Sequence, residues 1–303
     1  MLKLQSLNTA HIPLLREYFS LYSHEACDYS ICNLMTWGRI YDNQFALWRE
    51  HLVIFIPRFQ YVFFPVGKGL VPEELTELLS LFHLDFKDAE LILIPEEYLS
   101  ANPEMELFFE IREDRAWADY IYSTEKMVSL SGKKLAKKKN LVSQFIRAYP
   151  DYKVLKITPD RRDVIISFTE KWRREREAEG IYLNTEFIAI KNALDMWNEL
   201  PIEGLIICLH NRIVAYSIFS EQTPKMATIH FEKFDPDKKG SGQIVNWETA
   251  KHLSQRYAWI NREQDIGLPG LRQAKLSYMP DYLIKFFSAK VKSQENKHYH
   301  QHP

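Results

Sequence analysis

Two groups of short apolar segments, one in each half of the chain, constrain its fold most strongly. Each segment has the length of a β-strand, and tight turns separate the members of each group, as is typical of an antiparallel meander. The first group covers residues 45–48, 52–56 and 61–65, and the second covers residues 204–210, 213–220 and 226–234. We therefore expect two similar, mostly antiparallel sheets.

Helical patterns surround both meanders. Apolar residues at helical spacing predict helices that begin at Pro13 and Pro72, one over residues 132–149, and others that begin near Thr158, near Thr185 and after Gly240. Shorter strands complete each half, and the last is expected at residues 283–291.

Both halves thus follow the order helix, helix, meander, helix, strand and further strand. This order predicts an α+β protein with a duplicated architecture. The first domain is expected at residues 1–128, a linking lysine-rich helix at 129–150, and the second domain at 151–303.

Composition narrows the class of protein. The 303 residues include 39 basic and 40 acidic ones, so the whole chain has no charge excess for binding nucleic acid, although a local basic patch is compatible with this balance. The three cysteines are too few for a disulfide framework, and Cys27 and Cys32 lack metal-ligand spacing, so no metal site is expected.

No segment has the pattern of a membrane anchor or of a signal peptide. The longest apolar stretch, residues 52–66, is interrupted by Pro57 and Arg58 and is too short to cross a bilayer. We expect a cytoplasmic protein whose contact with a membrane is at most peripheral.

Residues 259–280 combine many charged and hydroxyl side chains with turn-forming residues. The turn formers are Gly267, Pro269 and Gly270, and apolar runs flank the segment. Loops held by a rigid scaffold often carry binding and catalytic residues, so this segment is the first candidate for a site. An ordinary polar turn is the alternative.

A glycine pair marks a second candidate site. Gly240 and Gly242 follow the second meander and precede a helix. Glycine lets the backbone approach a ligand closely, and the N–H groups at a helix start attract anions. Lys239, Gly240, Ser241 and Gly242 are therefore candidates for binding a phosphate-containing cofactor. In the alternative reading, Ser241 caps a helix behind a flexible turn.

This glycine loop resembles the loop of GCN5-related acyltransferases that binds the pyrophosphate of coenzyme A. Asp237 departs from the pattern, because these enzymes have Gln or Arg at that position. An acidic residue there repels a pyrophosphate, which weakens the prediction of coenzyme A binding.

A longer resemblance covers the second half well and the first half loosely. The chain resembles the soluble C-terminal domain of bacterial phosphatidylglycerol lysyltransferases and its stand-alone relatives. The matching points are Glu232-Lys233, Gly240-Ser241, Asn261-Arg262-Glu263, Asp265-Ile266-Gly267, Gly270-Leu271-Arg272, Ala274-Lys275-Leu276-Ser277-Tyr278, Pro280, and, upstream, residues 130–140 with Phe145.

The resemblance implies two tandem GCN5-related acyltransferase folds, akin to the Fem peptidyltransferases. Membrane-bound members of the family move an aminoacyl group from aminoacyl-tRNA to a lipid hydroxyl. We accordingly expect transfer of an acyl or aminoacyl group, with aminoacyl-tRNA as donor, to an amine or hydroxyl. The pocket is expected between the glycine pair and residues 265–278.

Transfer of this kind requires a base and groups that stabilise an oxyanion. Asp265 and Glu263 are candidate bases, and Tyr278 is a candidate acid. In the alternative reading, Asp265 pairs with Arg272 or Lys275 only to brace the loop, and Tyr278 belongs to the core. The candidates for substrate binding are Lys233, Asn261, Arg272, Lys275 and Ser277.

Five lysines lie between Lys133 and Lys139 and form a candidate contact for the backbone of aminoacyl-tRNA. A solvated helix face is the common alternative for such a run. Two other functions stay open at this point. One is an N-acetyltransferase that uses acyl-CoA, which rests on the glycine pair, and the other is a non-catalytic binding module on the same fold.

Overall fold

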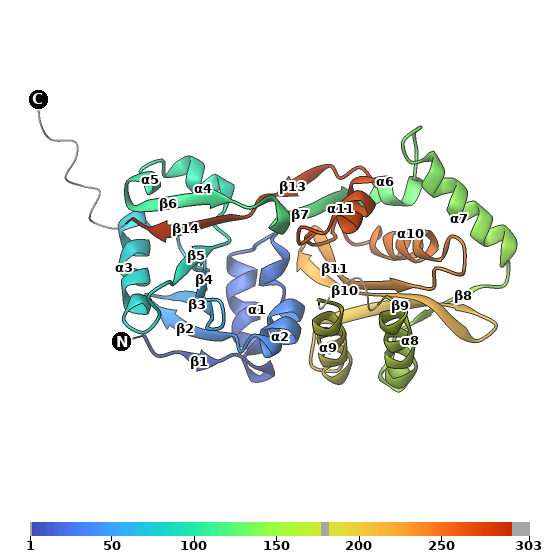
Figure 1. Cartoon of the computed structure of the whole chain (residues 1–303), viewed down its shortest axis with the longest axis horizontal. Coiled ribbons are helices and arrows are strands. Elements are labelled where there is room, and N and C mark those ends of the chain that lie inside the picture. The colour runs from blue at the N-terminus through green and yellow to red at the C-terminus, as the bar shows by residue number, and fades with distance from the viewer. Residues whose placement is uncertain (1, 177–181, 293–303) are drawn as a thin grey trace, which may run out of the picture. The chain divides into compact units, whose positions relative to one another are not determined.

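A computed structural model describes residues 2–176 and 182–292. The chain forms two compact units, each with one seven-stranded sheet (Figure 1). The first unit takes the described parts of Met1–Ser23, Tyr41–Trp117 and Lys285–Pro303, and the second takes His24–Ile40 and Ala118–Ile284. Both predicted meanders are present, and the predicted α+β class is confirmed.

The first unit packs its sheet against α3 (Pro72–His83). Apolar residues of α3 at spacings of three and four residues face the sheet core. The strand order is β1-β2-β3-β4-β5-β14-β6, and every pair is antiparallel except β4 with β5. The remaining elements are β1 Gln5–Ser6, α1 Ile12–Leu21, β2 Gln44–Trp48, β3 His51–Ile56, β4 Tyr61–Phe63, β5 Glu90–Ile92, α4 Glu96–Ala101, α5 Met105–Phe108, β6 Phe109–Glu113 and β14 Phe287–Val291.

The second unit repeats this arrangement around a sheet of order β13-β7-β12-β11-β10-β9-β8. Here β11 and β12 are the parallel pair. The elements are α2 Ile31–Ile40, β7 Asp119–Ser123, α6 Thr124–Ser129, α7 Ala136–Ala148, β8 Lys153–Lys156, α8 Arg162–Arg174, α9 Tyr182–Asp195, β9 Ile202–Leu209, β10 Arg212–Thr223, β11 Met226–Phe234, α10 Ser241–Leu253, β12 Trp259–Asn261, α11 Pro269–Leu276 and β13 Tyr282–Ile284.

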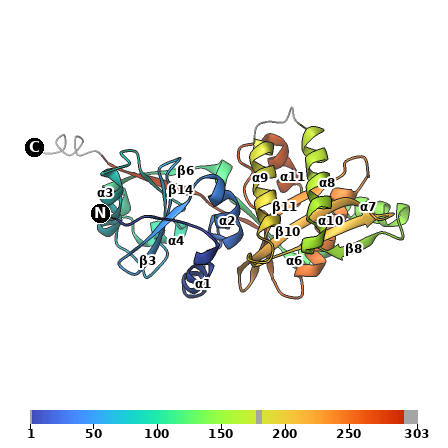
Figure 2. The same cartoon turned by 90° about the horizontal axis from the view of Figure 1, so that it is seen from below.

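Helices cover both faces of the second sheet. The helices α8 and α9 lie side by side under one face (Figure 2), and α10 lies on the other face, with α7 packed against it (Figure 1). Phe145 of α7, Ile244 of α10 and Ile229 of β11 belong to one buried apolar cluster on that side.

The two halves of the chain exchange strands. After β6 the chain adds β7 to the second sheet, and after β13 it adds β14 to the first sheet between β5 and β6. The units therefore differ from the boundaries predicted at residues 128 and 150. An exchange of this kind leaves no mark on the linear order of elements, because it depends on pairing between strands distant in sequence.

Three predicted elements need correction. The helix expected at residues 132–149 begins later, at Ala136, because Gly132 has φ 88°. Thr185 does not cap a helix, since it lies inside α9. The single strand expected at residues 283–291 is two strands, β13 and β14, which pair in different sheets.

A fork between β11 and β12 positions the polar residues of the second unit. The two strands pair in parallel over three residues of each, from Met226 with Trp259 to Thr228 with Asn261, and β11 then continues to Phe234 paired only with β10. A β-bulge at His230 shifts the alternation of β11 by one residue. Ile229 before the bulge and Glu232 after it consequently face α10.

Candidate functional site

Asn261, the last residue of β12, holds the backbone at the fork. Its side chain is fully buried and donates from Nδ2 to Asp119 Oδ2 at 2.7 Å and to the carbonyl of Glu25 at 3.0 Å. Its Oδ1 accepts the backbone N–H of Glu263 at 2.7 Å, which fixes Glu263 in a left-handed conformation with φ 57°. The predicted substrate-binding residue Asn261 therefore positions its neighbours.

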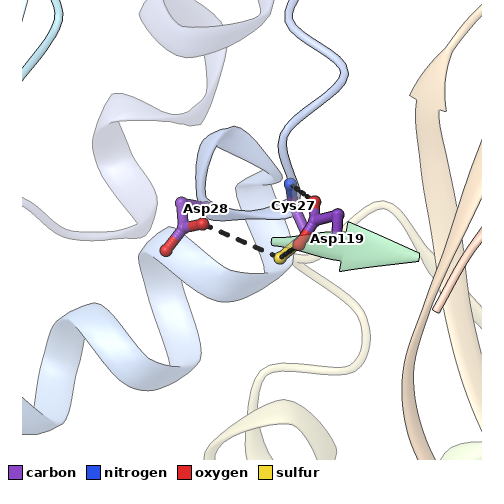
Figure 3. Close-up of side chains that lie close together, drawn as sticks. All are labelled: Cys27, Asp28 and Asp119. Carbon is purple, nitrogen blue, oxygen red and sulfur yellow. Dashed lines mark hydrogen bonds between the residues drawn. The ribbon is translucent and has the colours of Figure 1, made fainter. Parts of the chain in front are cut away.

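A thiol and two carboxyl groups converge on one side of this residue. Cys27, Asp28 and Asp119 each place one potential ligand atom within 4.8 Å of the others (Figure 3). The Cys27 thiol lies 3.3 Å from Asp119 Oδ1 and 3.8 Å from Asp28 Oδ2, and the backbone N–H of Cys27 donates to Asp119 Oδ2 at 2.7 Å. The amide of Gln264 donates to Asp28 at 2.8 Å.

Burial favours the protonated forms of the groups in this thiol–carboxyl cluster. Burial, and then the charges of Asp119 and Glu263, raise the pKa of Asp28 to about 7. Burial also raises the pKa of Asp119 to about 6, against hydrogen bonds from Asn261 and Cys27. Burial raises the pKa of the Cys27 thiol well above its ordinary value. Hydrogen bonds hold the two carboxyl groups in place: Asp119 accepts from the Cys27 N–H and from Asn261, and Asp28 accepts from Gln264.

Sequence reasoning missed this thiol–carboxyl cluster. Cys27 and Asp28 lie in a segment without clear periodicity, and Asp119 opens a strand almost a hundred residues later. The spacing offers no metal or catalytic motif, and the pairing of β7 with β12 is what brings Asp119 beside Asn261.

The Glu263 carboxylate faces His230 at the bulge of β11. Glu263 Oε1 lies 2.9 Å from His230 Nδ1 and accepts the amide of Asn33 at 2.9 Å. The other ring nitrogen of His230 lies 2.8 Å from the Ser220 hydroxyl. Burial lowers the pKa of His230, but Cys32 and Glu263 outweigh it and raise the pKa to about 10. Glu263, a predicted base, is thus the partly buried half of a charge pair with His230.

Lys275 is buried in α11 and contacts backbone carbonyls. Its Nζ donates to the carbonyl oxygens of Arg262 and of Glu263, the latter at 3.3 Å. Among residues 2–176 and 182–292, no carboxylate lies within ion-pair distance of this ammonium group. Burial, and then the charge of Arg262, lower the pKa of Lys275 to about 8. A group that titrates near neutral pH is suited to accept and return a proton.

Asp265 and Arg272 brace the turn that leads into α11. The carboxylate of Asp265 accepts two hydrogen bonds from Arg272, at 2.7 and 2.9 Å, one from Tyr120 at 2.5 Å and one from the N–H of Gly267 at 2.9 Å. Burial opposes ionisation, but Arg272 and Tyr120 lower the pKa of Asp265 to about 2. This geometry supports the bracing alternative rather than the predicted role of Asp265 as a base.

Tyr278 lies on the other side of the fork, beneath two cations. Its ring contacts Arg262 at 5.2 Å and Lys138 of α7 at 4.4 Å, and its hydroxyl is hydrogen-bonded to Gln243 of α10. Burial raises the pKa of Tyr278, so this hydroxyl keeps its proton and can donate a hydrogen bond. Arg262 also pairs with Glu232 at 3.0 Å.

Two predicted substrate-binding residues lie apart from this arrangement. Lys233 points to the opposite face of β11, where it pairs with Glu186 at 2.6 Å and lies 4.6 Å from the ring of Trp172. The hydroxyl of Ser277 donates to the carbonyl of Ala274 at 2.6 Å and so caps the end of α11.

The glycine pair approaches protein rather than a ligand. A Cβ on Gly240 would lie 2.7 Å from the carbonyl oxygen of Leu141 in α7, and a Cβ on Gly242 would lie 3.0 Å from the ring of Phe234. Ser241 is buried and donates its hydroxyl to the carbonyl of Asp235 at 2.6 Å. Packing against α7 and β11 therefore accounts for both glycines, and they lend no support to the predicted pyrophosphate cradle.

Replacement of Gly240 by Ala tests this account of the glycine loop. We expect Gly240→Ala to lower the free energy of unfolding by about 2–4 kcal/mol, because it combines a left-handed backbone with a clash. Gly270→Ala is the control, since a Cβ there meets no atom within 4 Å. Urea denaturation of both variants decides, and equal stabilities would contradict the packing role of Gly240.

Asp28→Asn tests the protonated state of the thiol–carboxyl cluster. The folded-state pKa of Asp28 is about 7, above its ordinary 3.8, so folding retains a proton that the unfolded chain loses between these values. Wild-type stability should fall across that range by up to about 1.4 kcal/mol per pH unit, and Asn removes this loss.

The stability of Asp28→Asn relative to wild type should therefore increase from pH 5 to pH 8 in thermal denaturation. Asp163→Asn, at an exposed position, controls for the loss of one charge. A relative stability of Asp28→Asn that falls towards pH 8 would show that the ionised carboxylate is the stabilising form.

Comparison with known proteins identifies a family that matches most of this chain. The family described as phosphatidylglycerol lysyltransferase, C-terminal, matches residues 19–290. An uncharacterised protein from Mycoplasmoides gallisepticum is 24% identical over 247 residues, which cover 78% of this chain and 77% of the relative.

Solved structures share the fold over nearly the whole chain. A conserved protein of unknown function from Bacteroides thetaiotaomicron has a TM-score of 0.90 at 28% identity, over 96% of this chain and all (100%) of the other. L-PGS from Bacillus licheniformis has a TM-score of 0.66 at 13% identity, over 94% of this chain and 93% of the other.

The predicted pair of tandem GCN5-related acyltransferase folds is confirmed. In the described part of the chain, no helix combines the length and apolar character needed to span a bilayer. Because the family match extends over most of its residues, the chain belongs to the phosphatidylglycerol lysyltransferase C-terminal family.

Proposed function

We propose that this protein transfers an aminoacyl group from aminoacyl-tRNA to an amine or hydroxyl acceptor, with Lys275 as the group that carries the proton. The reaction class is supported by the family, which is named for transfer of a lysyl group. The role of Lys275 is supported by its position at the fork of the second sheet. The single observation that carries the proposal is a buried lysine whose pKa is lowered to about 8 and whose partners are carbonyl oxygens.

The proton balance of the reaction assigns two successive tasks to Lys275. Neutral Nζ takes a proton from the attacking amine or hydroxyl, which forms a bond to the ester carbonyl carbon of the aminoacyl group. The bond from that carbon to the ribose oxygen then breaks, and the ammonium returns the proton to the leaving oxygen. In this proposal the hydroxyl of Tyr278 and the guanidinium of Arg262, which lie next to each other, bind oxygen atoms of the donor.

The lysine-rich helix supplies a surface for the donor. Residues 131–148 contain five lysines and Arg147 and no acidic residue, in a chain whose net charge is −1. Lys133, Lys134, Lys137 and Lys139 are exposed. Cations grouped in this way attract a phosphate backbone and make its binding dependent on salt.

Substitution of Lys275 tests the proposal. We expect Lys275→Met to slow release of labelled amino acids from charged tRNA by a factor of about 10²–10⁴, the usual contribution of a positioned acid or base. Lys275→Arg should be as slow, because a guanidinium keeps its proton. Lys171→Met in α8, which is exposed, is the control.

The pH dependence adds a second test of Lys275. The wild-type rate should rise with pH and level off above about 8, where Nζ is neutral. The assay uses tRNAs each charged with one labelled amino acid and a panel of amine and hydroxyl acceptors. Full activity of Lys275→Arg would remove the base role, since only the positive charge would then be needed.

The two other functions predict different outcomes. Acetyl-coenzyme A should leave the melting temperature unchanged, and a rise at saturating ligand would favour a coenzyme A enzyme. Salt-dependent binding of charged tRNA without release of label from any of the tRNAs would favour a non-catalytic binding module.

A further inference from the structure

A group of cations surrounds Tyr278 with little opposing charge. Lys138 of α7 lies 4.4 Å from the centre of its ring, and Arg262 lies 5.2 Å from the same ring and 5.9 Å from that of Tyr122. Lys275 reaches the carbonyl of Arg262 from the neighbouring helix. Lys138 and Arg262, which are far apart in sequence, thus bring their cations to one ring, whereas the ammonium of Lys275 lies by the backbone of Arg262 and 5.7 Å from the ring of Tyr120.

The carboxylate beside Arg262 is already engaged. Glu232 pairs with Arg262 at 3.0 Å and accepts the amide of Asn246 at 3.3 Å. For Lys138 and Lys275, no carboxylate of the described residues lies within 4 Å. The aromatic rings hold the cations in place but do not neutralise them.

Lys138 differs from the other lysines of its run. Lys133, Lys134, Lys137 and Lys139 are exposed, whereas Lys138 is partly buried and its side chain turns towards Tyr278. Burial, and then the charge of Arg262, lower the pKa of Lys138, as they do for Lys275. An anion between Lys138 and Arg262 would pair with the buried ammonium and so offset the cost of its burial. It would also screen the repulsion between the ammonium and the guanidinium.

We propose that Lys138 and Arg262 form a subsite for a phosphodiester group of RNA, beside Lys275. This inference rests on the proposed function for its biological role, because the phosphodiester would belong to the end of the aminoacylated RNA. The lysine face of α7 leads to this subsite, and the Tyr278 hydroxyl and the Gln243 amide lie next to it as polar partners.

The character of α7 favours RNA over a lipid surface. A helix that lies in a membrane interface exposes large apolar residues beside its basic ones. The exposed large apolar residues of the described chain include none from residues 131–148, and the apolar residues Val142 and Phe145 of α7 are buried in the core. The exposed side of α7 is therefore suited to phosphates in water.

Binding of a trinucleotide to the full-length protein tests the subsite. We expect isothermal titration calorimetry at low salt to give at least tenfold weaker binding for Lys138→Met than for wild type. Lys171→Met in α8, an exposed lysine outside the lysine-rich helix, should weaken binding no more than about twofold. Affinity of the wild type should fall as pH rises through 8, because a phosphate favours protonated Lys275.

Equal binding by wild type and Lys138→Met would overturn the subsite, and so would an equal loss for both lysine variants, which would indicate a general charge effect. Stronger competition by phosphatidylglycerol vesicles than by the trinucleotide would assign the phosphate to a lipid headgroup and refute the RNA assignment.

Thermal denaturation of Lys138→Met checks that the variant folds. In the transfer reaction, Lys138→Met should raise KM for the charged tRNA and leave kcat within about threefold. Trinucleotide binding is measured without any transfer step. If Lys138→Met binds the trinucleotide as well as wild type does, the proposed role of Lys275 in transfer is therefore unaffected. A failure of transfer would likewise leave the subsite testable by binding.

Discussion

The second unit depends on the side chain of one buried amide, Asn261. Its Nδ2 holds Asp119 and the carbonyl of Glu25, and its Oδ1 holds the N–H of Glu263 at the point where β12 leaves β11. These hydrogen bonds keep Glu263 in a left-handed conformation that a residue with a side chain seldom adopts. They also point the carbonyls of Arg262 and Glu263 at Lys275. The catalytic proposal therefore rests on geometry that a non-catalytic amide maintains.

The turn after Asn261 separates two electrostatic environments. On one side the thiol–carboxyl cluster retains protons, because burial makes two neighbouring negative charges too costly. On the other side Lys138 and Arg262 carry more positive charge than Glu232 balances. Lys275 lies between these environments, and its pKa is lowered by burial and Arg262 and raised in part by Glu263 and Asp119. A pKa near neutrality results from these opposing influences.

Much of this architecture follows from the sequence, but the roles of its residues do not. Periodicity predicts both meanders, and residues 259–280, which are dense in polar groups, form the segment that enters the fork. The same pattern cannot show that Asp265 and Arg272 use their hydrogen bonds on each other. Gly240 and Gly242 illustrate a further limit, since a glycine needed for packing and one needed for a ligand look alike. Lys138 and Asp119 act through strand pairing and helix packing over long distances, which a linear pattern does not contain.

The measurement that tests the account most directly is a titration of the Lys275 side-chain nitrogen by NMR, with ¹⁵N-labelled lysine and Lys275→Arg to assign the signal. The account predicts a midpoint near pH 8, well below the ordinary 10.5, for a buried ammonium group held by carbonyl oxygens. A midpoint at or above 10 would contradict it, because Lys275 would then stay charged at neutral pH and could not accept a proton from the acceptor.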